Sequence, residues 1–406
     1  MNKYFLKDLF EKPISGEWGK ELEDGIIGFP VIRTTNFTNI GEINYDDLAY
    51  RDIDPIKKEN KFLKLGDIII EKSGGTPDNP VGRVVYFNKK EKNFFTNNFT
   101  AALRSKSNAD SKYLFYLLYY LHKRKVVLKY QNKTTGIINL QLNDYLKKTE
   151  VKIPTLSKQK ETVDLLDGLR NLIKIRKNQI QAYDDLIESL FFEMLQTELI
   201  TDKIEYSKLG DLTSHISSGS TPRGGSSVYK SEGIPLIRSQ DVKMNNLNYS
   251  NIAHIDIETH EKMKRSKLKN RDVLLNITGA SIGRTAVFYG EDDSANTNQH
   301  VAAIRLKDKK VSPEFLSFYF STEYFQDIIK NISSGGTREA LNYKQIREFD
   351  IPLISKMKQE KFIKNKEKIE IEKKKLNASL LELEGLFNSL MEDAFSGNLF
   401  KEWEGR

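Results

Sequence analysis

The sequence of 406 residues contains no cysteine. A chain without cysteine cannot carry a disulfide scaffold, a thiolate zinc site or a cysteine nucleophile, and it is easiest to reconcile with a reducing compartment. A long apolar run is missing too, because Tyr113–Leu121 has less than half the length that a membrane span needs. The opening MNKYFLKDLF lacks the apolar core of a secretory signal. We therefore expect a soluble, cytoplasmic protein with no membrane partner.

Motifs of several enzyme classes are also absent. The sequence has neither a GxxxxGK[ST] phosphate loop nor a GxGxxG turn between a strand and a helix. Gly279–Gly283 matches a nucleophile elbow, but the residues after it predict a strand where an elbow needs a helix. His260 has no second histidine at zinc-helix spacing, so no metal site is predicted. The Asp/Asn-Pro-Pro-aromatic tetrapeptide of adenine methyltransferases does not occur. We expect a non-catalytic chain that binds no cofactor itself.

Basic residues, in contrast, are in surplus. The formal net charge is +8 and the isoelectric point is near 9.1, which favours a polyanionic partner. The surplus lies in residues 1–156, whereas residues 157–200 are slightly acidic. The densest group is Lys123-Arg124-Lys125, followed by Lys129 and Lys133. Taken alone, this group could equally be a solvated surface.

An internal repeat is the strongest signal in the sequence. FPVIRTTNF at residues 29–37 is answered by IPLIRSQDV at residues 234–242. Further segments match at a similar offset, and the small drift in that offset is what loop insertions produce. These pairs are 63–69 with 268–274, 81–87 with 282–288, 96–104 with 297–305, 142–143 with 341–342 and 153–154 with 351–352. The chain therefore contains two similar domains.

Each copy predicts short strands between Gly, Pro and Asn turns, with one helix at 111–122 or 312–322. After Pro154 and again after Pro352, apolar residues recur in steps of three and four, which is typical of a long helix with a coiled-coil seam. The predicted seam residues are Leu166, Leu169, Ile173, Ile180, Tyr183, Ile187, Leu190, Ile369, Leu376, Leu380, Leu383, Phe387 and Leu390.

Two equal domains related by a twofold axis need antiparallel helices between them. We therefore expect the two helices to pair as a spacer about 60 Å long and the molecule to be a dumbbell. The alternative is that each helix is amphipathic and lies on its own domain.

Loops rich in glycine and hydroxyl side chains lie beside basic residues in both copies. Glycine lets the backbone approach a phosphate, Ser and Thr donate hydrogen bonds, and Arg can bind guanine with two hydrogen bonds. The candidate DNA-binding residues are Arg33, Thr34, Ser73, Gly74, Gly75, Thr76, Arg83, Lys123, Arg124, Lys125, Lys133, Thr134 and Thr135 in the first copy, and Ser218, Gly219, Ser220, Thr221, Arg223, Arg238, Gln240, Thr278, Arg284, Gly335, Gly336, Thr337 and Arg338 in the second. Each loop alone could be a plain turn, and Arg33 and Arg238 could be structural arginines paired with nearby acids.

These segments resemble a known family. The resemblance is to the specificity subunit of a type I restriction-modification system, and it covers essentially the whole chain. The residues that carry it are YSKLGDL at 206–212, SGSTP at 218–222, IPLIRSQDV, Gly283-Arg284, Leu341-Asn342, Ile351-Pro352 and LMEDAFSGNL at 390–399. The first copy departs most at its start, where Lys7-Asp8-Leu9-Phe10 replaces the leucine-glycine-aspartate opening of the second.

The resemblance implies a division of labour. Such subunits carry two target-recognition domains that each read one half of a split double-stranded DNA target, and the helices act as a ruler and dock two modification subunits. Those partners bind S-adenosylmethionine and methylate adenine, and restriction subunits use ATP and Mg²⁺. The implied fold class is α+β: two similar α/β target-recognition domains separated by two long antiparallel helices (a coiled-coil spacer) in a pseudo-twofold internal repeat. We expect domains at 1–155 and 201–353, and helices at 156–200 and 354–406.

The loops of the two copies differ, as SGGTPDNP and SGSTPRGG illustrate, so we expect an asymmetric target. Two alternatives stay open. A stand-alone DNA-binding regulator would have no use for apolar outer faces on the helices, for which Leu165, Leu172, Phe191 and Phe192 are candidates. A purely architectural coiled-coil scaffold would bind DNA with little dependence on salt.

Overall fold

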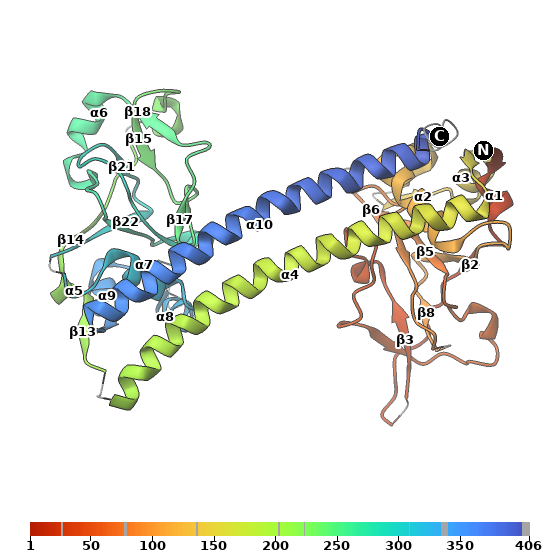
Figure 1. Ribbon diagram of the computed structural model, residues 1–406, viewed down its shortest axis with the longest axis horizontal. Coiled ribbons are helices and arrows are strands. Elements are labelled where there is room, and N and C mark those ends of the chain that lie inside the picture. The colour runs from red at the N-terminus through yellow and green to blue at the C-terminus, as the bar shows by residue number, and fades with distance from the viewer. Residues whose placement is uncertain are drawn as a thin grey trace. The chain divides into compact units, whose positions relative to one another are not determined.

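The protein folds into two units that share both long helices. The computed structural model describes residues 1–25, 27–76, 79–91, 93–134, 137–201, 204–222, 224–307, 309–333 and 340–399. Unit 1 comprises Met1–Asn178 and Ala378–Arg406, and unit 2 comprises Gln179–Asn377. Helices α4 (Leu156–Thr201) and α10 (Lys356–Ser396) each contribute one part to unit 1 and the other to unit 2 (Figure 1).

Among its described residues, unit 1 contains four sheets, and its main sheet has the order β2-β9-β5-β7. A second sheet has the order β4-β3-β8, a third β10-β11-β6, and β1 pairs with β12. The strands are β1 (Asn2–Phe5), β2 (Ile14–Ser15), β3 (Phe29–Ile32), β4 (Ala49–Arg51), β5 (Ile68–Glu71), β6 (Ser73–Gly75), β7 (Val84–Tyr86), β8 (Phe95–Thr96), β9 (Thr100–Leu103), β10 (Gln131–Thr134), β11 (Ile137–Leu140) and β12 (Glu150–Ile153). The shorter helices are α1 (Leu6–Leu9), α2 (Ser111–Lys123) and α3 (Leu142–Lys148).

Among its described residues, unit 2 repeats three of these sheets and has β16-β17 as a further pair. Its main sheet has the order β14-β22-β19-β20, its second sheet β18-β15-β21, and β13 pairs with β23. The strands are β13 (Tyr206–Lys208), β14 (Thr213–Ser218), β15 (Ile234–Ile237), β16 (Val242–Lys243), β17 (Asn246–Leu247), β18 (Ala253–Ile255), β19 (Val273–Asn276), β20 (Thr285–Val287), β21 (Asn296–Thr297), β22 (Val301–Leu306) and β23 (Asp350–Pro352). The helices are α5 (Leu209–Leu212), α6 (Ile257–Lys262), α7 (Pro313–Ser321), α8 (Glu323–Ser333) and α9 (Tyr343–Arg347).

The main sheet of each unit is the middle of three layers. In β5, Ile68 and Ile70 pack on α2, whereas Ile69 packs with Ile32 of the second sheet. In β19, Val273 and Leu275 pack with α7, whereas Leu274 packs with Ile237. Successive side chains of a strand point to opposite faces, so a strand covered on both faces must be apolar at every position, as β5 and β19 nearly are. The repeated sequence FPVI and IPLI forms β3 and β15, each of which pairs in parallel with a two-residue strand.

A buried glutamine joins each long helix to its unit. The Gln159 side chain is 1% exposed, and its Oε1 accepts a hydrogen bond of 2.8 Å from the Asp110 amide, at the N-terminus of α2. The Gln359 Oε1 accepts one of 2.9 Å from the Ser312 amide, at the N-terminus of α7. Both glutamines also donate to the carbonyl five residues before them. The start of α4 and the start of α10 are therefore attached in the same way.

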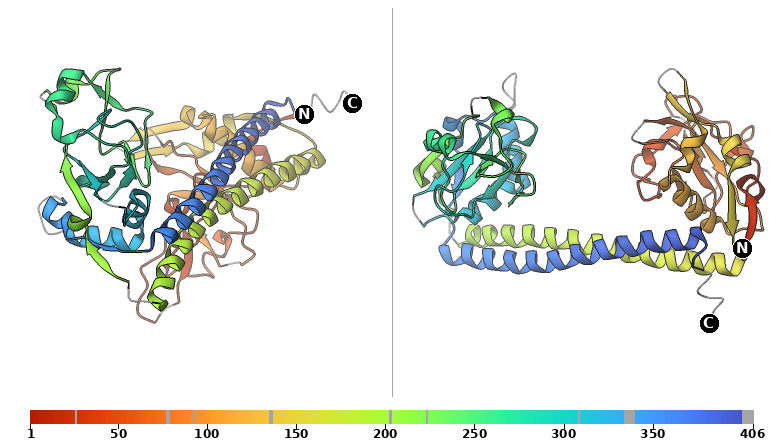
Figure 2. Two further views of the ribbon diagram at one scale, coloured as in Figure 1. Left: turned by 60° about the vertical axis from the view of Figure 1, so that its left-hand side comes forward. Right: turned by 90° about the horizontal axis from the view of Figure 1, so that it is seen from above.

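Within each unit the two long helices run antiparallel. In unit 1, Lys177 Nζ lies 2.8 Å from Glu384 Oε1. In unit 2, Asp184 pairs with Lys373, and the Phe191 ring centroid lies 5.3 Å from that of Phe362. Figure 2 shows α10 (blue) alongside α4 (yellow to green) within each unit. The two helices follow the antiparallel pairing that the sequence predicted.

The residues of the predicted seam face inward. Leu166 and Ile187 are buried. The half-buried residues are Leu169, Ile173, Ile180, Tyr183, Leu190, Ile369, Leu376, Leu380, Leu383, Phe387 and Leu390. The prediction for Phe191 was wrong, because its ring is fully buried among Phe315, Phe318 and Phe362. Phe192 is 42% exposed instead, so only one of these two adjacent rings can face outward on a helix.

Two further expectations need correction. The first copy begins like the second, because Leu6-Lys7-Asp8-Leu9 forms α1 as Leu209–Leu212 forms α5, each after a strand paired with β12 or β23. The apparent departure came from matching the opening one residue too late. Each copy also has more than one helix before its long helix, since α3 in unit 1 and α6, α8 and α9 in unit 2 are additional. Helices α3, α6 and α9 are short and carry little apolar periodicity to read. Helix α8 is different, because Phe325, Ile328, Ile329 and Ile332 have helical spacing that the sequence analysis overlooked. None of the helices in the described ranges is long and apolar enough to cross a membrane.

Candidate nucleic-acid interface

In unit 2, several of the predicted loop residues meet at one end of the main sheet. Ser218 ends β14, and Thr278 follows β19, whose end lies on the same side of the sheet with β22 between the two strands. The Thr221 hydroxyl binds Gln299 Oε1, and Thr278 Oγ1 lies 2.5 Å from His300 Nδ1. A hydrogen bond of 2.8 Å between Gln299 Nε2 and His300 Nε2 connects the two. The sequence analysis had not named Gln299 or His300, although both are variable positions inside a repeated segment.

Residues from the segment that precedes β23 lie at the same end of unit 2. The Tyr343 hydroxyl lies 2.5 Å from Ser218 Oγ and 2.8 Å from the Ser218 amide. Thr278 forms a β-bridge with Ala340. Gly219 is required here because a Cβ at this position would overlap the carbonyl oxygen of Thr297. The predicted residues Arg223, Gly335, Gly336, Thr337 and Arg338 lie outside the described residues, and Ser220 is exposed.

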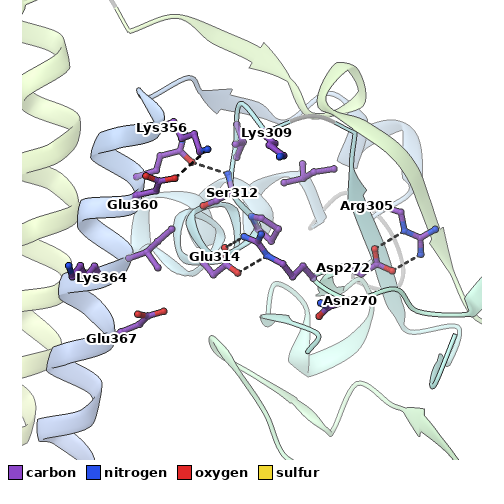
Figure 3. Close-up of a pocket in the computed structure, with 16 residues that line it drawn as sticks. Asn270, Asp272, Arg305, Lys309, Ser312, Glu314, Lys356, Glu360, Lys364 and Glu367 are labelled. Atoms are coloured by element: carbon purple, nitrogen blue, oxygen red, sulfur yellow. Dashed lines mark hydrogen bonds and ion pairs between the residues drawn. The ribbon is translucent and has the colours of Figure 1, made fainter. Parts of the chain in front are cut away.

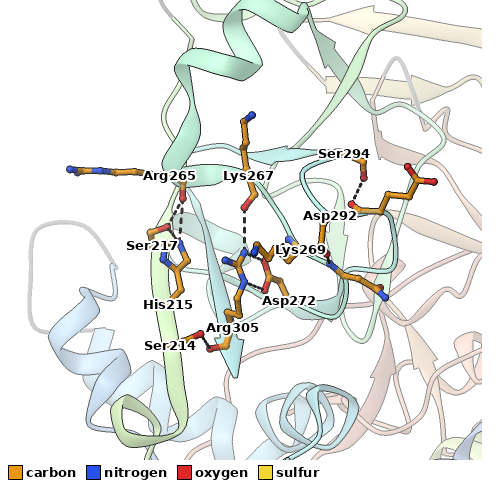
Figure 4. A network of polar contacts seen from close by, with 12 residues as sticks. Ser214, His215, Ser217, Arg265, Lys267, Lys269, Asp272, Asp292, Ser294 and Arg305 are labelled. Atoms are coloured by element: carbon orange, nitrogen blue, oxygen red, sulfur yellow. Dashed lines mark hydrogen bonds and ion pairs between the residues drawn. The ribbon is translucent and has the colours of Figure 1, made fainter. Parts of the chain in front are cut away.

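A second group of polar contacts lies beside this end. Ser217 Oγ donates to the carbonyl of Arg265 at 2.8 Å and lies 2.6 Å from His215 Nε2 (Figure 4). Arg265 is exposed, and its side chain points away from these groups in Figure 4. This arrangement leaves a guanidinium at the edge of a surface of hydroxyl and amide groups.

In unit 1, the predicted loops form a small sheet at the corresponding end. Ser73–Gly75 is β6, which pairs with β11, and β11 pairs with the strand that contains Lys133 and Thr134. Gly74 has a φ of 106°, where glycine is favoured. The Thr76 hydroxyl accepts a hydrogen bond of 3.1 Å from the Asn79 amide. The backbone therefore brings these two loops together, and Thr135 lies outside the described residues.

The recurring arginines Arg33 and Arg238 form ion pairs within their own loops. Arg33 Nη2 lies 2.9 Å from Asp47 Oδ2, and Arg238 Nε lies 3.0 Å from Asp241 Oδ2. Both guanidinium groups also donate to backbone carbonyls. This geometry fits the structural alternative for these two arginines. Their neighbours Thr34, half-buried, and Gln240, exposed, have no such partner through their side chains in the described part of the chain.

The aligned pair Arg83 and Arg284 differs between the units. Arg83 forms two hydrogen bonds of 2.9 Å with the buried carboxylate of Glu71, which raise its pKa. Asn276 stands at the position of Glu71 in unit 2, and its amide instead donates to the Ser239 carbonyl. Arg284 is half-buried and has no carboxylate partner among the described residues. Its charge is therefore free to bind another anion.

The basic cluster at the end of α2 belongs to a different part of unit 1. Lys123 lies over the Tyr119 ring, and Arg124 Nη1 lies 3.9 Å from Glu392 of α10. Lys125 adopts a left-handed backbone conformation with φ of 58°. All three side chains are exposed. The cluster thus adjoins the helix pair, where the structure gives it a carboxylate neighbour.

A pocket of about 800 Å³ lies between α7 and the start of α10 in unit 2 (Figure 3). Six of its charged side chains form ion pairs with one another. Arg271 Nη2 lies 2.6 Å from Glu314 Oε2, and Arg305 Nη2 lies 2.6 Å from Asp272 Oδ2. Lys356 Nζ lies 3.5 Å from Glu360 Oε1. These pairs make the pocket a structural junction. Among the described residues, no three His, Asp or Glu side chains are grouped as metal ligands.

The family of the chain follows from its sequence. The model of the type I restriction modification DNA specificity domain matches residues 1–182 and 201–382, one match for each copy of the repeat. The chain belongs to this family. It is a type I restriction-modification specificity subunit, whose role is recognition of a DNA sequence. The fold class that the sequence predicted is thereby confirmed, with two similar domains, mixed helix and sheet, and long helices.

Individual specificity subunits are distant relatives. The EcoBI specificity subunit of Escherichia coli is 30% identical over 176 residues, which cover 42% of this chain and 37% of that subunit. The MjaVIII subunit of Methanocaldococcus jannaschii is 24% identical, over 66% of this chain and 69% of that protein. The StySPI subunit of Salmonella potsdam is 22% identical, over 92% and 83%.

Solved structures share the fold of the specificity subunit. The S subunit from M. genitalium superposes with a TM-score of 0.56 at 16% identity, over 97% of this chain and 96% of that one. A chain from a study of complex assembly and conformational transition of the type I R-M system gives a TM-score of 0.54 at 15% identity, over 98% of both chains.

Proposed function

We propose that each unit reads one half of a bipartite, asymmetric DNA target. The observation that carries this proposal is the repeated three-layer frame with different side chains at one end of the main sheet. The shared frame would present one reading surface in each unit, and the side chains there differ, because Thr278 and Gln299 of unit 2 align with Ser73 and Asn98 of unit 1. Two unlike surfaces would select two unlike half-sites.

The proposal assigns the chain a non-catalytic role. Two adenine-methyltransferase subunits would supply S-adenosylmethionine-dependent chemistry, and restriction subunits would supply ATP- and Mg²⁺-dependent cleavage, so this chain would bind no cofactor. The proposal includes a cytoplasmic location, which the cysteine-free sequence favours.

The outer faces of α4 and α10 are the proposed docking surface for the modification subunits. In unit 1, Leu165 is 44% exposed and Leu172 is 49% exposed, and Leu381 of α10 is 71% exposed. In unit 2, Phe192 and Ile371 are 42% and 55% exposed. Large apolar side chains on a charged helix surface are costly to leave in water, and partner proteins commonly cover them. A regulator acting alone would gain nothing from them.

Co-expression with the modification subunit tests this function. The expected result is a complex of one specificity chain with two modification chains, measured by native mass spectrometry, and adenine methylation at a split motif, measured by single-molecule sequencing. A chain that stays alone, binds DNA tightly and leaves it unmethylated would instead indicate the stand-alone regulator. Leu172→Glu together with Leu381→Glu should prevent assembly, whereas Lys152→Glu, on exposed strand surface, should not.

The ruler function needs a separate test. Inserting seven residues after Asn178 and seven before Ala378 preserves the seam, because seven residues are about two helical turns. The insertion would lengthen the helix pair by roughly 10 Å, or about three base pairs at 3.4 Å each. We expect a longer gap between unchanged half-sites. Altered half-sites with an unchanged gap would contradict the ruler.

A further inference from the structure

The turn that enters the central strand of each main sheet has the same frame and different tips. In unit 1 it joins β8 to β9, and in unit 2 it joins β21 to β22. The frame residues Thr96 and Asn97 are 2% and 6% exposed, and their counterparts Thr297 and Asn298 are 0% and 7% exposed. The two residues at the tip, in contrast, reach the surface. We call Asn98 and Phe99, and in unit 2 Gln299 and His300, the tip pairs.

Both turns are fixed by the same backbone contacts. The Asn97 amide donates to the Ile32 carbonyl at 3.0 Å, and the Asn298 amide donates to the Ile237 carbonyl at 3.0 Å. Each turn is closed by a second hydrogen bond. The Thr100 amide donates to the Asn97 carbonyl at 3.1 Å in unit 1, and the Val301 amide donates to the Asn298 carbonyl at 3.2 Å in unit 2. These contacts hold each tip pair on a rigid strand end.

A glycine packs against each turn. A Cβ at Gly16 would overlap the Asn97 carbonyl oxygen, and one at Gly219 would overlap the Thr297 carbonyl oxygen. The two glycines follow β2 and β14, which are the edge strands of the main sheets of unit 1 and unit 2 respectively. The loop after each edge strand therefore lies directly against the tip pair. In unit 2 this loop contains Ser218 and Thr221, two of the predicted DNA-binding residues.

In unit 2 the tip pair is braced by hydrogen bonds. Gln299 Oε1 accepts from the Thr221 hydroxyl, and Gln299 Nε2 donates to His300 Nε2 at 2.8 Å. Because His300 Nε2 accepts, the proton of the neutral ring is on Nδ1, which donates to Thr278 Oγ1 at 2.5 Å. The carboxamide of Gln299 retains one N–H and one acceptor position. Gln299 is exposed, so this N–H and this acceptor position are free to bind a partner.

In unit 1 the tip pair is unbraced. Phe99 is 51% exposed, and its carbonyl accepts hydrogen bonds from the Lys72 amide at 2.7 Å and the Ser73 amide at 3.2 Å. Neither Asn98 nor Phe99 makes a side-chain hydrogen bond within the part of unit 1 that the structure describes. Lys72 therefore stands beside the tip, without a carboxylate partner among the described residues. Burial lowers the pKa of its ammonium group.

The side chains of the two tip pairs suit base edges rather than phosphates. Neither pair carries a lysine or arginine, which are the usual residues for phosphate. Asn98 and Gln299 each offer the donor and acceptor that match N6 and N7 of adenine in the major groove. Phe99 offers an apolar contact for the thymine methyl group. His300 differs from it, because both of its ring nitrogens are hydrogen-bonded, to Gln299 and Thr278, so it can offer a base only its C–H edge or its ring face. A basic residue also belongs to the surroundings of each tip pair, because the Lys72 amide donates to the Phe99 carbonyl in unit 1 and the Arg265 carbonyl accepts from Ser217 in unit 2.

We propose that the tip pairs Asn98-Phe99 and Gln299-His300 are specificity-determining residues, each reading adjacent base pairs in one half-site. This inference rests on the proposed function. The carboxamide contacts an adenine in both half-sites, and the second residue of each pair makes the two half-sites different. The repeated frame fixes where the readers are placed, and the tip pair sets what is read.

The test is a selection from randomised DNA duplexes by the complete complex with its modification subunits. The variants are Asn98→Ala, Gln299→Ala, Phe99→His and His300→Phe. Each alanine variant should lose about 10- to 100-fold of its preference for one A·T pair, in one half-site only. Phe99→His and His300→Phe should instead change the preference at the base pair next to that A·T pair. Total DNA affinity at low salt should change little, because phosphate contacts remain.

Two control variants have matched exposure at the opposite end of the same sheets. Leu65→Ala removes a side chain that is 53% exposed, and Asn270→Ala removes an exposed carboxamide. Both should leave the selected motif unchanged. Native mass spectrometry of each complex shows whether a variant still assembles.

The possible outcomes distinguish a failure of this inference from a failure of the proposed function. A bipartite motif for the wild type with the same motif for all four tip variants would overturn the inference and leave the proposed function standing. A wild-type complex that selects no motif would overturn the proposed function and with it this inference. A loss of preference in both half-sites from one alanine variant would also overturn it, because each tip pair belongs to one unit.

Discussion

Unit 1 and unit 2 are most alike at one buried ion pair and least alike where the main sheet ends. Arg104 forms a two-bonded ion pair with the buried Asp67, and Arg305 does the same with Asp272. By contrast, the buried Glu71 beside Arg83 is replaced by Asn276 beside Arg284. Duplication has therefore kept the contacts that hold the frame and changed the side chains around its exposed end.

The long helices add a second difference. Leu166 is fully buried in unit 1. Lys366 occupies the corresponding turn of α10 in unit 2, where it lies over the Phe318 ring and burial lowers its pKa. The comparison shows that the frame tolerates a partly desolvated lysine on α10 at the position where α4 has a buried leucine.

The largest expected effect breaks what the units share. Asp67→Ala should destabilise unit 1 by about 3–5 kcal/mol, because it leaves the Arg104 charge without its partner in a largely buried site. Asp272→Ala should do the same to unit 2. Hydrogen exchange of the amides in β5 and β19 measures each unit separately. Equal weakening of both units by one variant would contradict the idea of separate frames.

The matched control is an exposed ion pair. Asp54→Ala removes a carboxylate that pairs with Lys57 three residues on, at 3.2 Å on the surface. Exposed pairs contribute little to stability, so its effect should be far smaller than that of Asp67→Ala.

A smaller effect distinguishes the aligned arginines. Arg83→Ala should cost unit 1 about 2–3 kcal/mol, because it leaves the buried Glu71 carboxylate unpaired. Arg284→Ala should change the stability of unit 2 by less than about 0.5 kcal/mol but weaken DNA binding. Thermal unfolding and fluorescence anisotropy measure the two quantities. Equal stability losses would mean that Arg284 has a structural role like that of Arg83.

Lys366→Leu should stabilise unit 2 by about 1 kcal/mol at neutral pH, because it removes a partly desolvated charge. The sign with pH is definite. In the unfolded chain Lys366 keeps its proton up to its ordinary pKa of 10.5, whereas in the folded unit it loses the proton at a lower pH. The wild type therefore gains stability as the pH rises from the folded-state pKa to 10.5. The variant lacks this gain, so the difference in stability between variant and wild type should narrow as the pH rises towards 10.5. A constant difference would show that burial does not act on this charge.

The smallest effect concerns Lys72. Lys72→Ala should weaken DNA binding equally for all sequences and reduce the slope of log affinity against log salt by about 1. The selected motif should stay the same. A changed motif with an unchanged slope would place Lys72 on a base instead of a phosphate.

The sequence predicted the repeat and the long helices because both depend on apolar spacing that survives divergence. It missed Gln159 and Gln359, although Lys-Gln recurs at the same offset, because a buried polar anchor has no periodicity. It could not tell Phe191 from Phe192, since neighbouring helical residues differ in direction by about 100° and either could face the core. The tip pairs escaped notice because variable residues within a matching segment look like noise until the fold shows them exposed.

The cysteine-free sequence allows the most direct test of the claim that each unit reads one half-site. A single cysteine introduced as Thr76→Cys or Thr221→Cys can carry a photo-crosslinker in the complete complex on its own target DNA. We predict that Thr76→Cys crosslinks to one half-site and Thr221→Cys to the other, while Leu65→Cys gives only background. Crosslinks from both positions to the same half-site would contradict the account.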